Sequence, residues 1–302
     1  MDVSIVILSW NTRELLANCL QSIADDPLAP SHEVIVVDNA SEDGSREMVR
    51  DRFPDVRLLV NPVNLGFGAG NNTAIPVAQG RYVLFLNSDT LVHAGALAGL
   101  VAYADARPAV GIVGPKLLND DGSLQYSCRR YPTLGAGFFR NTPLGRLFPK
   151  NRFASDYLMQ EWPHQESIDV DWVSGAALMI RREVLDETKG FDEDFYFYCE
   201  DLELCWRVNH SGKWKVSYYP HAVVTHSIGR SSDKAPTRMT WEFHRSQYLF
   251  YRKHYRATTF VLARPLIPLG ILLRATGQMS RYRVNYWRRR LRGQHKPGGT
   301  KR

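Results

Sequence analysis

A few acidic residues and one histidine are the parts of this sequence best placed to do chemistry, and the first of them is Asp38. It follows the apolar run 33–37, which has the length of a buried strand, so its carboxylate should lie at the edge of a sheet. There it can accept a hydrogen bond from the N3–H group of uracil or thymine. Residues 38–41 also have the composition of a helix N-cap, and this alternative stays open.

Asp89 follows a second apolar run, 82–86, and is a candidate ligand for a divalent cation. Mg²⁺ and Mn²⁺ are hard cations that bind carboxylates together with substrate phosphates. Asp89 is the single acid of Asn87-Ser88-Asp89, so the phosphates would have to supply most of the ligands. His226 is a candidate second protein ligand. Helix capping by Asp89 and a structural role for His226 are the alternatives.

The segment 191–207, FDEDFYFYCEDLELCWR, holds the candidate for a general base. On a helix that begins near residue 199, Asp201 lies in the first turn, where the helix dipole favours the ionised carboxylate. An ionised carboxylate beside apolar neighbours can take a proton from a hydroxyl group. N-terminal capping is the alternative, and Glu200 is the second choice for the base.

The run 64–72 combines glycines with amide side chains, a composition that lets the backbone approach a ligand closely and donate N–H groups. It is not a dinucleotide-binding fingerprint, which follows the first strand of its fold; here Ser9-Trp10-Asn11 stands at that place. A P-loop with Gly-Lys-Ser/Thr is also missing from the sequence.

The elements that must position these residues alternate between short apolar runs and helical spacing. This alternation predicts an α/β fold with a Rossmann-like, mostly parallel twisted sheet and helices on both faces. Ligands bind such sheets beyond the carboxyl ends of the strands. We expect strands at 3–8, 33–37, 56–60, 82–86, 111–118, 214–218 and 222–225, and helices at 12–23, 43–53, 94–104 and 199–208.

Two further features concern the second half of the chain. The Pro/Gly/Arg-rich stretch 129–165 predicts a loop over the part of the site where a second substrate, the acceptor, would bind. On the helix 199–208, Glu203 and Arg207 are spaced as an i,i+4 ion pair, which we expect on a solvated face.

Composition limits the class of protein. With 302 residues and 44% apolar side chains, the chain can bury one large core or two small ones. The four cysteines have no zinc-site spacing and fit a reducing cytoplasm. The first apolar run, 3–8, is too short for a signal peptide and is interpreted as a strand.

Charge divides the chain into an acidic body and a basic tail. Residues 243–302 hold 15 of the 38 Lys and Arg residues and no acid, which leaves 23 − 31 = −8 for residues 1–242. The apolar stretch 257–273 is shorter than the ~20 residues that span a bilayer. Together with the arginines beyond it and with Tyr286 and Trp287, it predicts a basic C-terminal helical tail that associates with anionic lipid.

With such a tail, we expect the protein in the cytoplasm, peripheral on the inner face of the plasma membrane. A disordered solubilising tail and an RNA-binding tail are alternatives, but the tail has no nucleic-acid module, so no nucleic-acid partner is expected.

Taken together, the motifs resemble family 2 inverting glycosyltransferases, in particular the bacterial rhamnosyltransferase-like members that build cell-wall and surface polysaccharides. The resemblance runs from Val3 to about Tyr255. It rests on the order and spacing of Ser9-Trp10-Asn11, Asp38-Asn39-Ala40-Ser41, Asn64-Leu65-Gly66-Phe67-Gly68, Asn87-Ser88-Asp89, Trp172-Val173-Ser174-Gly175-Ala176, Glu200-Asp201 and His226.

The resemblance implies a GT-A fold with a nucleotide-sugar-binding half, 1–118, an acceptor-binding and catalytic half, 119–256, and the membrane-associating tail, 257–302. It implies Mg²⁺ or Mn²⁺ at Asp89 and His226, and Asp201, with Glu200, as the catalytic base. One departure is that the family's D-x-D element has a single acid here. The residues implied to bind the nucleotide-sugar are Ser9, Trp10, Asn11, Asp38, Asn64, Gly66, Phe67, Asn87, Ser88 and Asp89, and those for the sugar and acceptor are Trp172, Ser174, Gly175 and Ala176.

The implied activity is transfer of a sugar, for which L-rhamnose is one candidate, from a dTDP- or UDP-sugar to a lipid-linked or polysaccharide acceptor. The configuration at the sugar carbon would be inverted. Two alternatives are a sugar nucleotidyltransferase and a non-catalytic nucleotide-sugar-binding membrane protein. The first would be expected to carry a glycine-rich phosphate loop after the first strand, where this sequence has none.

Overall fold

The computed structural model describes residues 1–133, 147–148, 151–227 and 236–291. The chain divides into two compact units. Unit 1 comprises Met1–Tyr196 and Glu200–Ser231, and unit 2 comprises Phe197–Cys199 and Ser232–Arg302. Each unit is described by itself.

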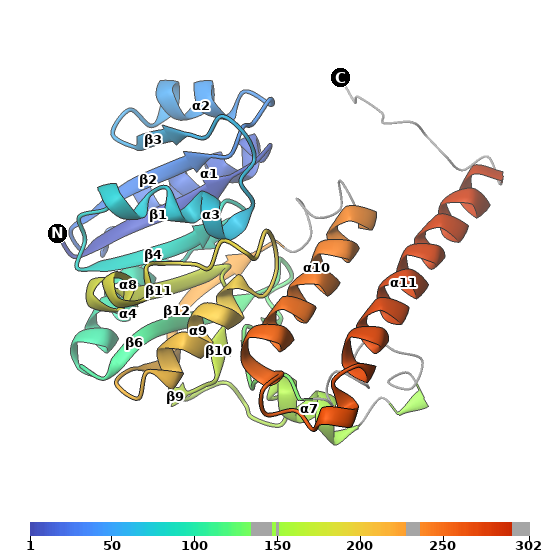
Figure 1. Cartoon of the computed structure of the whole chain (residues 1–302). Helices are drawn as coiled ribbons and strands as arrows, with labels where there is room; N and C mark the ends of the chain where they lie inside the picture. The colour runs from blue at the N-terminus through green and yellow to red at the C-terminus, as the bar shows by residue number, and fades with distance from the viewer. Residues whose placement is uncertain (134–146, 149–150, 228–235, 292–302) are drawn as a thin grey trace. The chain divides into compact units, whose positions relative to one another are not determined.

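Unit 1 is built on a ten-stranded sheet in the order β3-β2-β1-β4-β11-β6-β12-β5, with β7 beside β6 and β9 beside β12 (Figure 1). Strands β1 to β4 run parallel to one another, and β11 is antiparallel to both β4 and β6. A mostly parallel α/β sheet is therefore confirmed. The bounds are β1 Val3–Ser9, β2 His32–Asp38, β3 Arg57–Val60, β4 Tyr82–Asn87, β5 Thr90–Val92, β6 Val110–Leu118, β7 Leu124–Gln125, β9 Ile168–Asp169, β11 Ala177–Arg181 and β12 Lys215–His226; β8 Cys128–Arg129 and β10 Trp172–Val173 form a separate pair.

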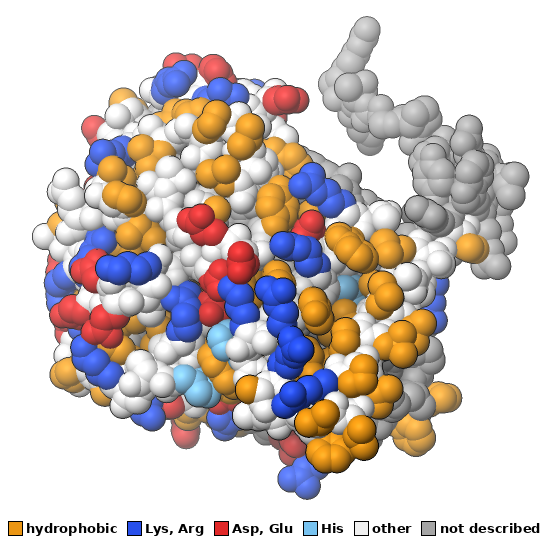
Figure 2. All heavy atoms as spheres, viewed as in Figure 1, with side chains coloured by type: hydrophobic (Ala, Val, Ile, Leu, Met, Phe, Trp, Pro, Cys, Tyr) orange, Lys and Arg blue, Asp and Glu red, His pale blue; other side chains and the backbone are white. Residues whose placement is uncertain are grey.

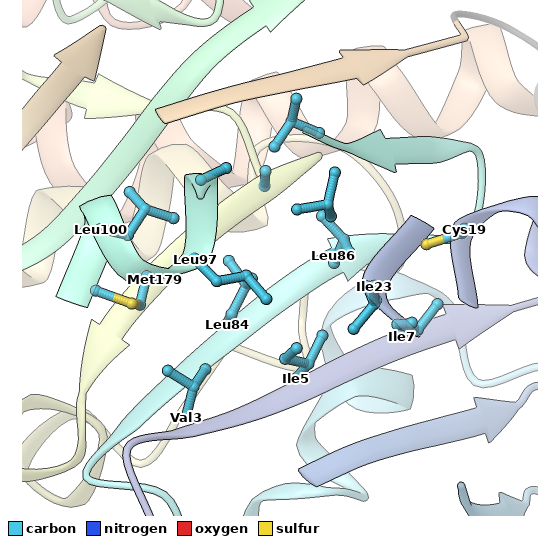
Figure 3. Close-up of a cluster of buried hydrophobic side chains, with 14 of the residues drawn as sticks. Val3, Ile5, Ile7, Cys19, Ile23, Leu84, Leu86, Leu97, Leu100 and Met179 are labelled. Carbon is cyan, nitrogen blue, oxygen red and sulfur yellow. The ribbon is translucent and has the colours of Figure 1, made fainter. Parts of the chain in front are cut away.

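Helices cover both faces of the sheet because its strands are apolar on both sides. One face carries Ile5, Ile7, Leu84 and Leu86, which pack against α1, α2 and α4 in a single buried cluster (Figure 3). On the other face, the ring of Phe85 packs edge-on against Phe191, with 4.8 Å between centroids. The helices of unit 1 are α1 Arg13–Ala24, α2 Ser45–Arg52, α3 Phe67–Asn72, α4 Ala96–Asp105, α7 Arg152–Leu158, α8 Arg182–Thr188 and α9 Glu200–His210, with a 3₁₀ turn, η1, at Ile75–Val77.

The structure differs from the sequence-based expectation at three places. The short strand β5 directly follows Asp89 where a helix cap was the alternative, because its backbone pairs with β12. The two strands expected at 214–218 and 222–225 are one strand, β12, with a register shift between Tyr219 and Val223. The stretch 129–165 contains α7, and residues 134–146, 149 and 150 of it lie outside the described residues.

The Glu203–Arg207 ion pair forms at 2.8 Å, but the solvated face expected for it is wrong. The side chain of Glu203 is only 2% exposed. Arg207 also donates to the carbonyl oxygens of Thr188 and Gly190, at 2.7 and 2.8 Å. The pair is buried because this side of α9 closes against the end of α8 and the turn that follows it.

The glycine-rich run 64–72 is mainly a packing element. Gly66 has φ +85°, and a Cβ atom there would lie 2.2 Å from the carbonyl oxygen of Tyr196. At Gly70 a Cβ would lie 2.7 Å from Leu8 Cδ1 of β1. Most of the run forms the helix α3, and its glycines bring the backbone close to neighbouring protein segments.

Unit 2 is a pair of packed helices, α10 Pro236–Phe250 and α11 Leu266–Leu291, joined by the π-helical turn η3 Tyr251–Tyr255 and the 3₁₀ turn η4 Val261–Ala263. Two contacts bind α10 to the segment 197–199. The Ser246 hydroxyl donates to the Phe197 carbonyl at 2.9 Å, and the rings of Tyr198 and Phe243 meet edge-on. Within the described residues, none of the helices is both long enough and apolar enough to cross a bilayer.

Candidate active site

The carboxyl ends of β1, β2 and β4 lie side by side, because the three strands are parallel and in register. Ser9 aligns with Asp38, and Leu8 aligns with Asn87. A chain of buried hydroxyl groups joins two of these strand ends: Ser9 Oγ lies 3.0 Å from Thr12 Oγ1, which lies 2.8 Å from Ser88 Oγ. This chain fixes the loop after β1 against the loop after β4.

The two carboxylate oxygens of Asp38 have different environments. Its Oδ2 atom accepts the Ser41 N–H at 3.0 Å, as a turn or cap residue does, and lies 3.3 Å from Arg46 Nε. Its Oδ1 atom is buried and has no hydrogen-bond partner among the described residues. A buried carboxylate oxygen without a partner is costly in the free protein and suits a site that binds a hydrogen-bond donor.

The neighbouring residue, Asn39, holds the loop that precedes α3. Its Nδ2 donates to Asn64 Oδ1 and to the Gly66 carbonyl, both at 3.0 Å. Its Oδ1 accepts from Asn61 Nδ2 at 3.1 Å and from the Leu65 N–H at 3.0 Å. Asn64 and Gly66, expected at the nucleotide-sugar, therefore lie beside Asp38 and are fixed by the protein itself. The sequence motif contained Asn39, but its role as the centre of this network became visible only in the fold.

Trp10 and Asn11 also lie at this edge of the sheet. Asn11 has φ +54°, and its backbone N–H donates to Ser41 Oγ at 3.0 Å. Its side-chain oxygen accepts the Glu42 N–H at 2.7 Å. Trp10 is partly exposed. The loop after β1 is thus bound to the loop that carries Asp38.

Asp89 and His226 come together although they are far apart in the sequence. Strand β5 pairs with β12 so that Thr90 lies opposite His226. His226 Nε2 then lies 3.4 Å from Asp89 Oδ1, and the two side chains are 14% and 10% exposed. Asn87 Nδ2 lies 3.2 Å from the same nitrogen. The fold therefore forms the Asp–His pair that the sequence offered as a candidate.

A glutamine that the sequence did not single out sets the tautomer of His226. Gln125 Nε2 donates to Asn119 Oδ1 at 2.9 Å and to the His226 carbonyl at 3.1 Å, which fixes the orientation of its amide group. Its Oε1 atom must therefore accept the 2.7 Å hydrogen bond from His226 Nδ1. His226 Nδ1 therefore carries a proton, and Nε2 faces Asp89 and Asn87.

This arrangement fits a divalent cation. Ligand atoms at 2.0–2.1 Å from Mg²⁺ in octahedral geometry are about 3 Å apart, close to the separation of the Asp89 and His226 atoms. No cluster of three or more His, Cys, Asp or Glu side chains suited to a metal occurs in the described parts of the chain. Two protein ligands leave most of the coordination sphere to substrate oxygens, so such a site would be completed by a diphosphate.

We expect Gln125→Leu to weaken the binding of Mn²⁺ in the presence of UDP or dTDP by about 10–100-fold, because His226 loses the partner that holds its ring and tautomer. Isothermal titration calorimetry measures this without turnover. Gln21→Leu is the matched control, because the Gln21 side chain is exposed on α1, where it bonds Asp25. An unchanged Mn²⁺ affinity in Gln125→Leu would show that Gln125 does not position His226.

Asp201 begins α9 and has its carboxylate held by two backbone groups. Oδ2 accepts the Gly175 N–H at 2.9 Å, and Oδ1 accepts the Leu202 N–H at 2.8 Å. Burial nevertheless raises the pKa of Asp201 above the usual value for aspartate, and the Gly175 N–H and the charge of Arg129 oppose this effect. The sequence indicated a carboxylate whose ionised form is stabilised by the helix dipole, but desolvation is the larger effect and acts in the opposite direction.

Its neighbour Glu200 is 6% exposed, and Glu200 Oε2 has no hydrogen-bond partner among the described residues. Burial, and next the charge of Asp201, raise the pKa of Glu200 well above its ordinary value. Asp201 has N–H donors that stabilise its ionised form, and Glu200 Oε2 has none. Of the two carboxyl groups, Asp201 therefore ionises first.

The turn 174–176 connects Asp201 with Asn87, whose side chain lies beside His226. The Ala176 carbonyl accepts the Asn87 N–H at 2.9 Å, and the Gly175 N–H donates to Asp201. A Cβ at Gly175 would lie 3.3 Å from Asp201 Cβ and 3.3 Å from the ring of Phe67, so only glycine allows this approach without displacement. The turn thus brings residues expected at the donor, at the acceptor and at the base into direct contact.

Trp172 has a different environment from the rest of its motif. It is 5% exposed, donates its indole N–H to the Arg130 carbonyl at 3.0 Å, and lies under the guanidinium group of Arg129. A buried ring has little surface for a sugar, so the geometry favours a supporting role for Trp172. Contacts of Ser174, Gly175 and Ala176 with a substrate stay a prediction.

The curled, mostly parallel sheet with acidic residues at its strand ends is the GT-A fold, the class of nucleotide-sugar-dependent transferases. Solved structures agree on this fold. The chain aligns with Staphylococcus aureus TarS 1–349 at TM-score 0.53 and 16% identity, covering 91% of this chain and 81% of TarS 1–349. It aligns with the mannosyltransferase PcManGT from Pyrobaculum calidifontis, in complex with GDP-Man and Mn²⁺, at TM-score 0.53 and 20% identity, covering 92% and 74%.

Sequence similarity then gives the family. Residues 1–253 match the model described as "Glycosyltransferase like family 2", and the chain belongs to this family. It is 32% identical over 228 residues to the N-acetylglucosaminyl-diphospho-decaprenol L-rhamnosyltransferase of Mycobacterium tuberculosis, covering 72% of this chain and 73% of the relative. It is 26% identical over 244 residues to the rhamnosyltransferase WbbL of Escherichia coli K12, covering 76% and 86%. The chain is thus a glycosyltransferase, as the motifs indicated.

Proposed function

We propose that the protein transfers L-rhamnose from a dTDP- or UDP-sugar to a lipid-linked acceptor during synthesis of a cell-wall or surface glycan. The observation that carries this proposal is the turn 174–176, whose backbone bonds Asn87 on the donor side and Asp201 on the acceptor side. The two relatives named as rhamnosyltransferases, each covered over more than two thirds of its length, support the choice of sugar.

Asp38 is proposed to bind the base of the donor nucleotide. Its partnerless Oδ1 atom is an acceptor for the N3–H of uracil or thymine, and Arg46 Nε lies 3.3 Å from the other carboxylate oxygen. Uracil and thymine present the same group to it, so Asp38 accommodates either donor. Because Asp38 Oδ1 is buried, a base that donates a hydrogen bond to it satisfies an acceptor that has no protein partner among the described residues.

Mg²⁺ or Mn²⁺ would be held by Asp89 and His226 together with the diphosphate of the donor. When bound, the cation stabilises the negative charge that develops on the departing diphosphate. Asn87 orients the Nε2 side of His226, and Gln125 orients the other side of the ring. These four side chains therefore prepare one half of the site.

Asp201 is proposed to take the proton of the attacking acceptor hydroxyl. The hydroxyl attacks the sugar carbon on the side opposite the diphosphate, the bond to the diphosphate breaks, and the configuration is inverted. The raised pKa of Asp201 suits this task, because a stronger base removes a hydroxyl proton more readily. The Gly175 N–H keeps the carboxylate oriented while its charge changes.

The test is a transfer assay with purified protein, a panel of nucleotide-sugars, Mg²⁺ or Mn²⁺, and a short-chain polyprenyl diphospho-N-acetylglucosamine as acceptor. We expect a rhamnosylated product from dTDP-rhamnose, with the inverted anomeric configuration seen by NMR. Transfer of another sugar would correct the donor. Release of diphosphate from a nucleoside triphosphate would instead indicate a nucleotidyltransferase, and donor binding without turnover would indicate a non-catalytic protein.

The proposed acceptor places the protein at the cytoplasmic side of the plasma membrane. A lipid-linked substrate stays in the bilayer, so an enzyme bound to the same surface meets it at high local concentration. The basic residues between 243 and 302 suit attachment to anionic lipid.

A further inference from the structure

Unit 2 exposes a group of large apolar side chains at the end where α11 begins. Figure 2 shows hydrophobic side chains gathered over this part of the surface. Between 48% and 73% of each side chain is exposed, which is unusual for so many neighbours in one segment. This apolar face comprises Phe260, Val261, Leu262, Leu266, Leu269, Leu272 and Leu273.

The apolar face is one side of a helix whose other side is already packed. Leu266, Leu269 and Leu273 follow one another at intervals of three and four residues and share a side of α11. Ala275 is 1% exposed, and Ile267 and Ile271 are partly buried, on the side that faces α10. The helix is therefore apolar all round in its first turns, and one half of that surface is left uncovered by the described residues of unit 2.

Basic residues lie next to the apolar face in the sequence and in the fold. Arg252, Lys253 and Arg256 are exposed on η3 and directly after it, just before the face begins. Arg264 donates to the carbonyl oxygens of Thr259 and Ala257, at 3.1 and 3.3 Å, and so holds the turn that carries Phe260 and Leu262. No acidic residue occurs between 243 and 302 to offset these charges.

We propose that the apolar face inserts into the interfacial layer of an anionic bilayer, with the start of α11 lying along the membrane surface. The leucine side chains enter the boundary between headgroups and acyl chains, and Arg252, Lys253 and Arg256 contact lipid phosphates. This inference rests on the proposed function, because a lipid-linked acceptor requires the enzyme to work at a bilayer. The sequence-based expectation of a membrane-associating tail also included Tyr286 and Trp287, whose side chains lie outside the described residues.

A second copy of the chain is the competing occupant of the face. Charge argues against it, because a pair of copies meeting through this surface would bring two sets of basic residues together. Like charges in contact oppose association, whereas an anionic bilayer neutralises them. The structure therefore favours lipid, and the state of association becomes one outcome of the test.

The experiment measures co-sedimentation of the full chain with vesicles of phosphatidylglycerol and phosphatidylcholine, and with phosphatidylcholine alone. We expect binding to the anionic vesicles that weakens in high salt. The double variant Leu266→Gln/Leu273→Gln should lower the partition coefficient at least tenfold, because two leucines no longer leave water. Arg252→Gln/Arg256→Gln should lower it by a similar factor and remove most of the salt dependence.

The matched control is Leu28→Gln/Leu91→Gln, which changes two exposed leucines of unit 1 and should bind as the unchanged protein does. Thermal unfolding of each variant checks that the fold is kept. Equal vesicle binding by the Leu266/Leu273 variant overturns the proposal. So does a wild-type dimer, seen by light scattering, that this variant dissociates.

Failure of this inference can be told apart from failure of the proposed function. Transfer to a soluble, detergent-free analogue of the acceptor should be unchanged in the Leu266/Leu273 variant, because none of these residues belongs to unit 1. Vesicle binding without any transfer would refute the proposed activity but would still support membrane binding by the apolar face. Transfer without vesicle binding would refute only the proposal that the apolar face binds the membrane.

Discussion

Replacing Asp201 by asparagine should lower kcat by about 10²–10⁴-fold, the contribution that a positioned general base makes to a proton transfer. The substitution keeps one side-chain oxygen, which can still accept the Gly175 N–H and so hold the turn 174–176, and replaces the oxygen that accepts the Leu202 N–H by an amide NH2 group. The dissociation constant of the donor nucleotide should therefore be unchanged. Steady-state rates and nucleotide titrations of the same preparation measure the two quantities separately.

Glu200→Gln is the matched control for that experiment. Glu200 is adjacent and buried, and burial raises its pKa well above the ordinary value, so a neutral amide should disturb its site less than it disturbs that of Asp201. We expect this variant to keep most of the activity. The reverse outcome, with Glu200→Gln inactive and Asp201→Asn active, would transfer the role of base to Glu200.

The pH profile should report the same carboxylate. Burial raises the pKa of Asp201, so the base loses its function by protonation at a higher pH than an ordinary aspartate near 3.9 would. The value of kcat/KM should rise with pH through the raised pKa and then level off. Arg129 favours the ionised form of Asp201, so Arg129→Gln should move this acid limb to higher pH. An acid limb at the ordinary aspartate pKa would contradict the burial of the base.

The second large effect is expected at Asp89. Asp89→Asn removes the carboxylate ligand of the proposed cation site and leaves the imidazole of His226. Loss of several kcal/mol of charge stabilisation corresponds to a decrease in kcat/KM of on the order of 10²–10³-fold. Donor binding should also lose its dependence on Mn²⁺ or Mg²⁺. Thermal shift with dTDP-rhamnose, with and without the cation, measures this dependence because a bound ligand raises the unfolding temperature.

Asp120→Asn is a suitable control for Asp89→Asn. Asp120 is exposed and accepts a hydrogen bond from Ser227, next to His226, so its replacement removes a negative charge near the same strand end. It should leave the metal-dependent shift intact. An Asp89→Asn protein whose shift equals that of the unchanged protein would show that the cation does not bind at Asp89.

The amino-acid sequence by itself determined the order of the elements and the residues at the strand ends. Strands such as 3–8 and 82–86 are readable because an unbroken apolar run is a local pattern that burial on both faces of a parallel sheet requires. The placement of Asp38 and Asp89 at the sheet edge follows from these runs, since Asp38 is the last residue of β2 and Asp89 lies two residues beyond the end of β4. The family resemblance rests on the same local motifs, and the match over residues 1–253 confirms it.

Only the tertiary structure decided which of these residues meet. Asn87 and His226 are 139 positions apart and bond because β12 pairs with β5, a strand too short to show a pattern of its own. Gln125 has no sequence signal, and its role follows from two carbonyl-type acceptors that fix its amide. The raised pKa of Asp201 and the exposure of Leu266 depend on what covers each side chain. Burial and strand register are non-local, whereas periodicity and capping are local, and this difference separates what the sequence determines from what the fold adds.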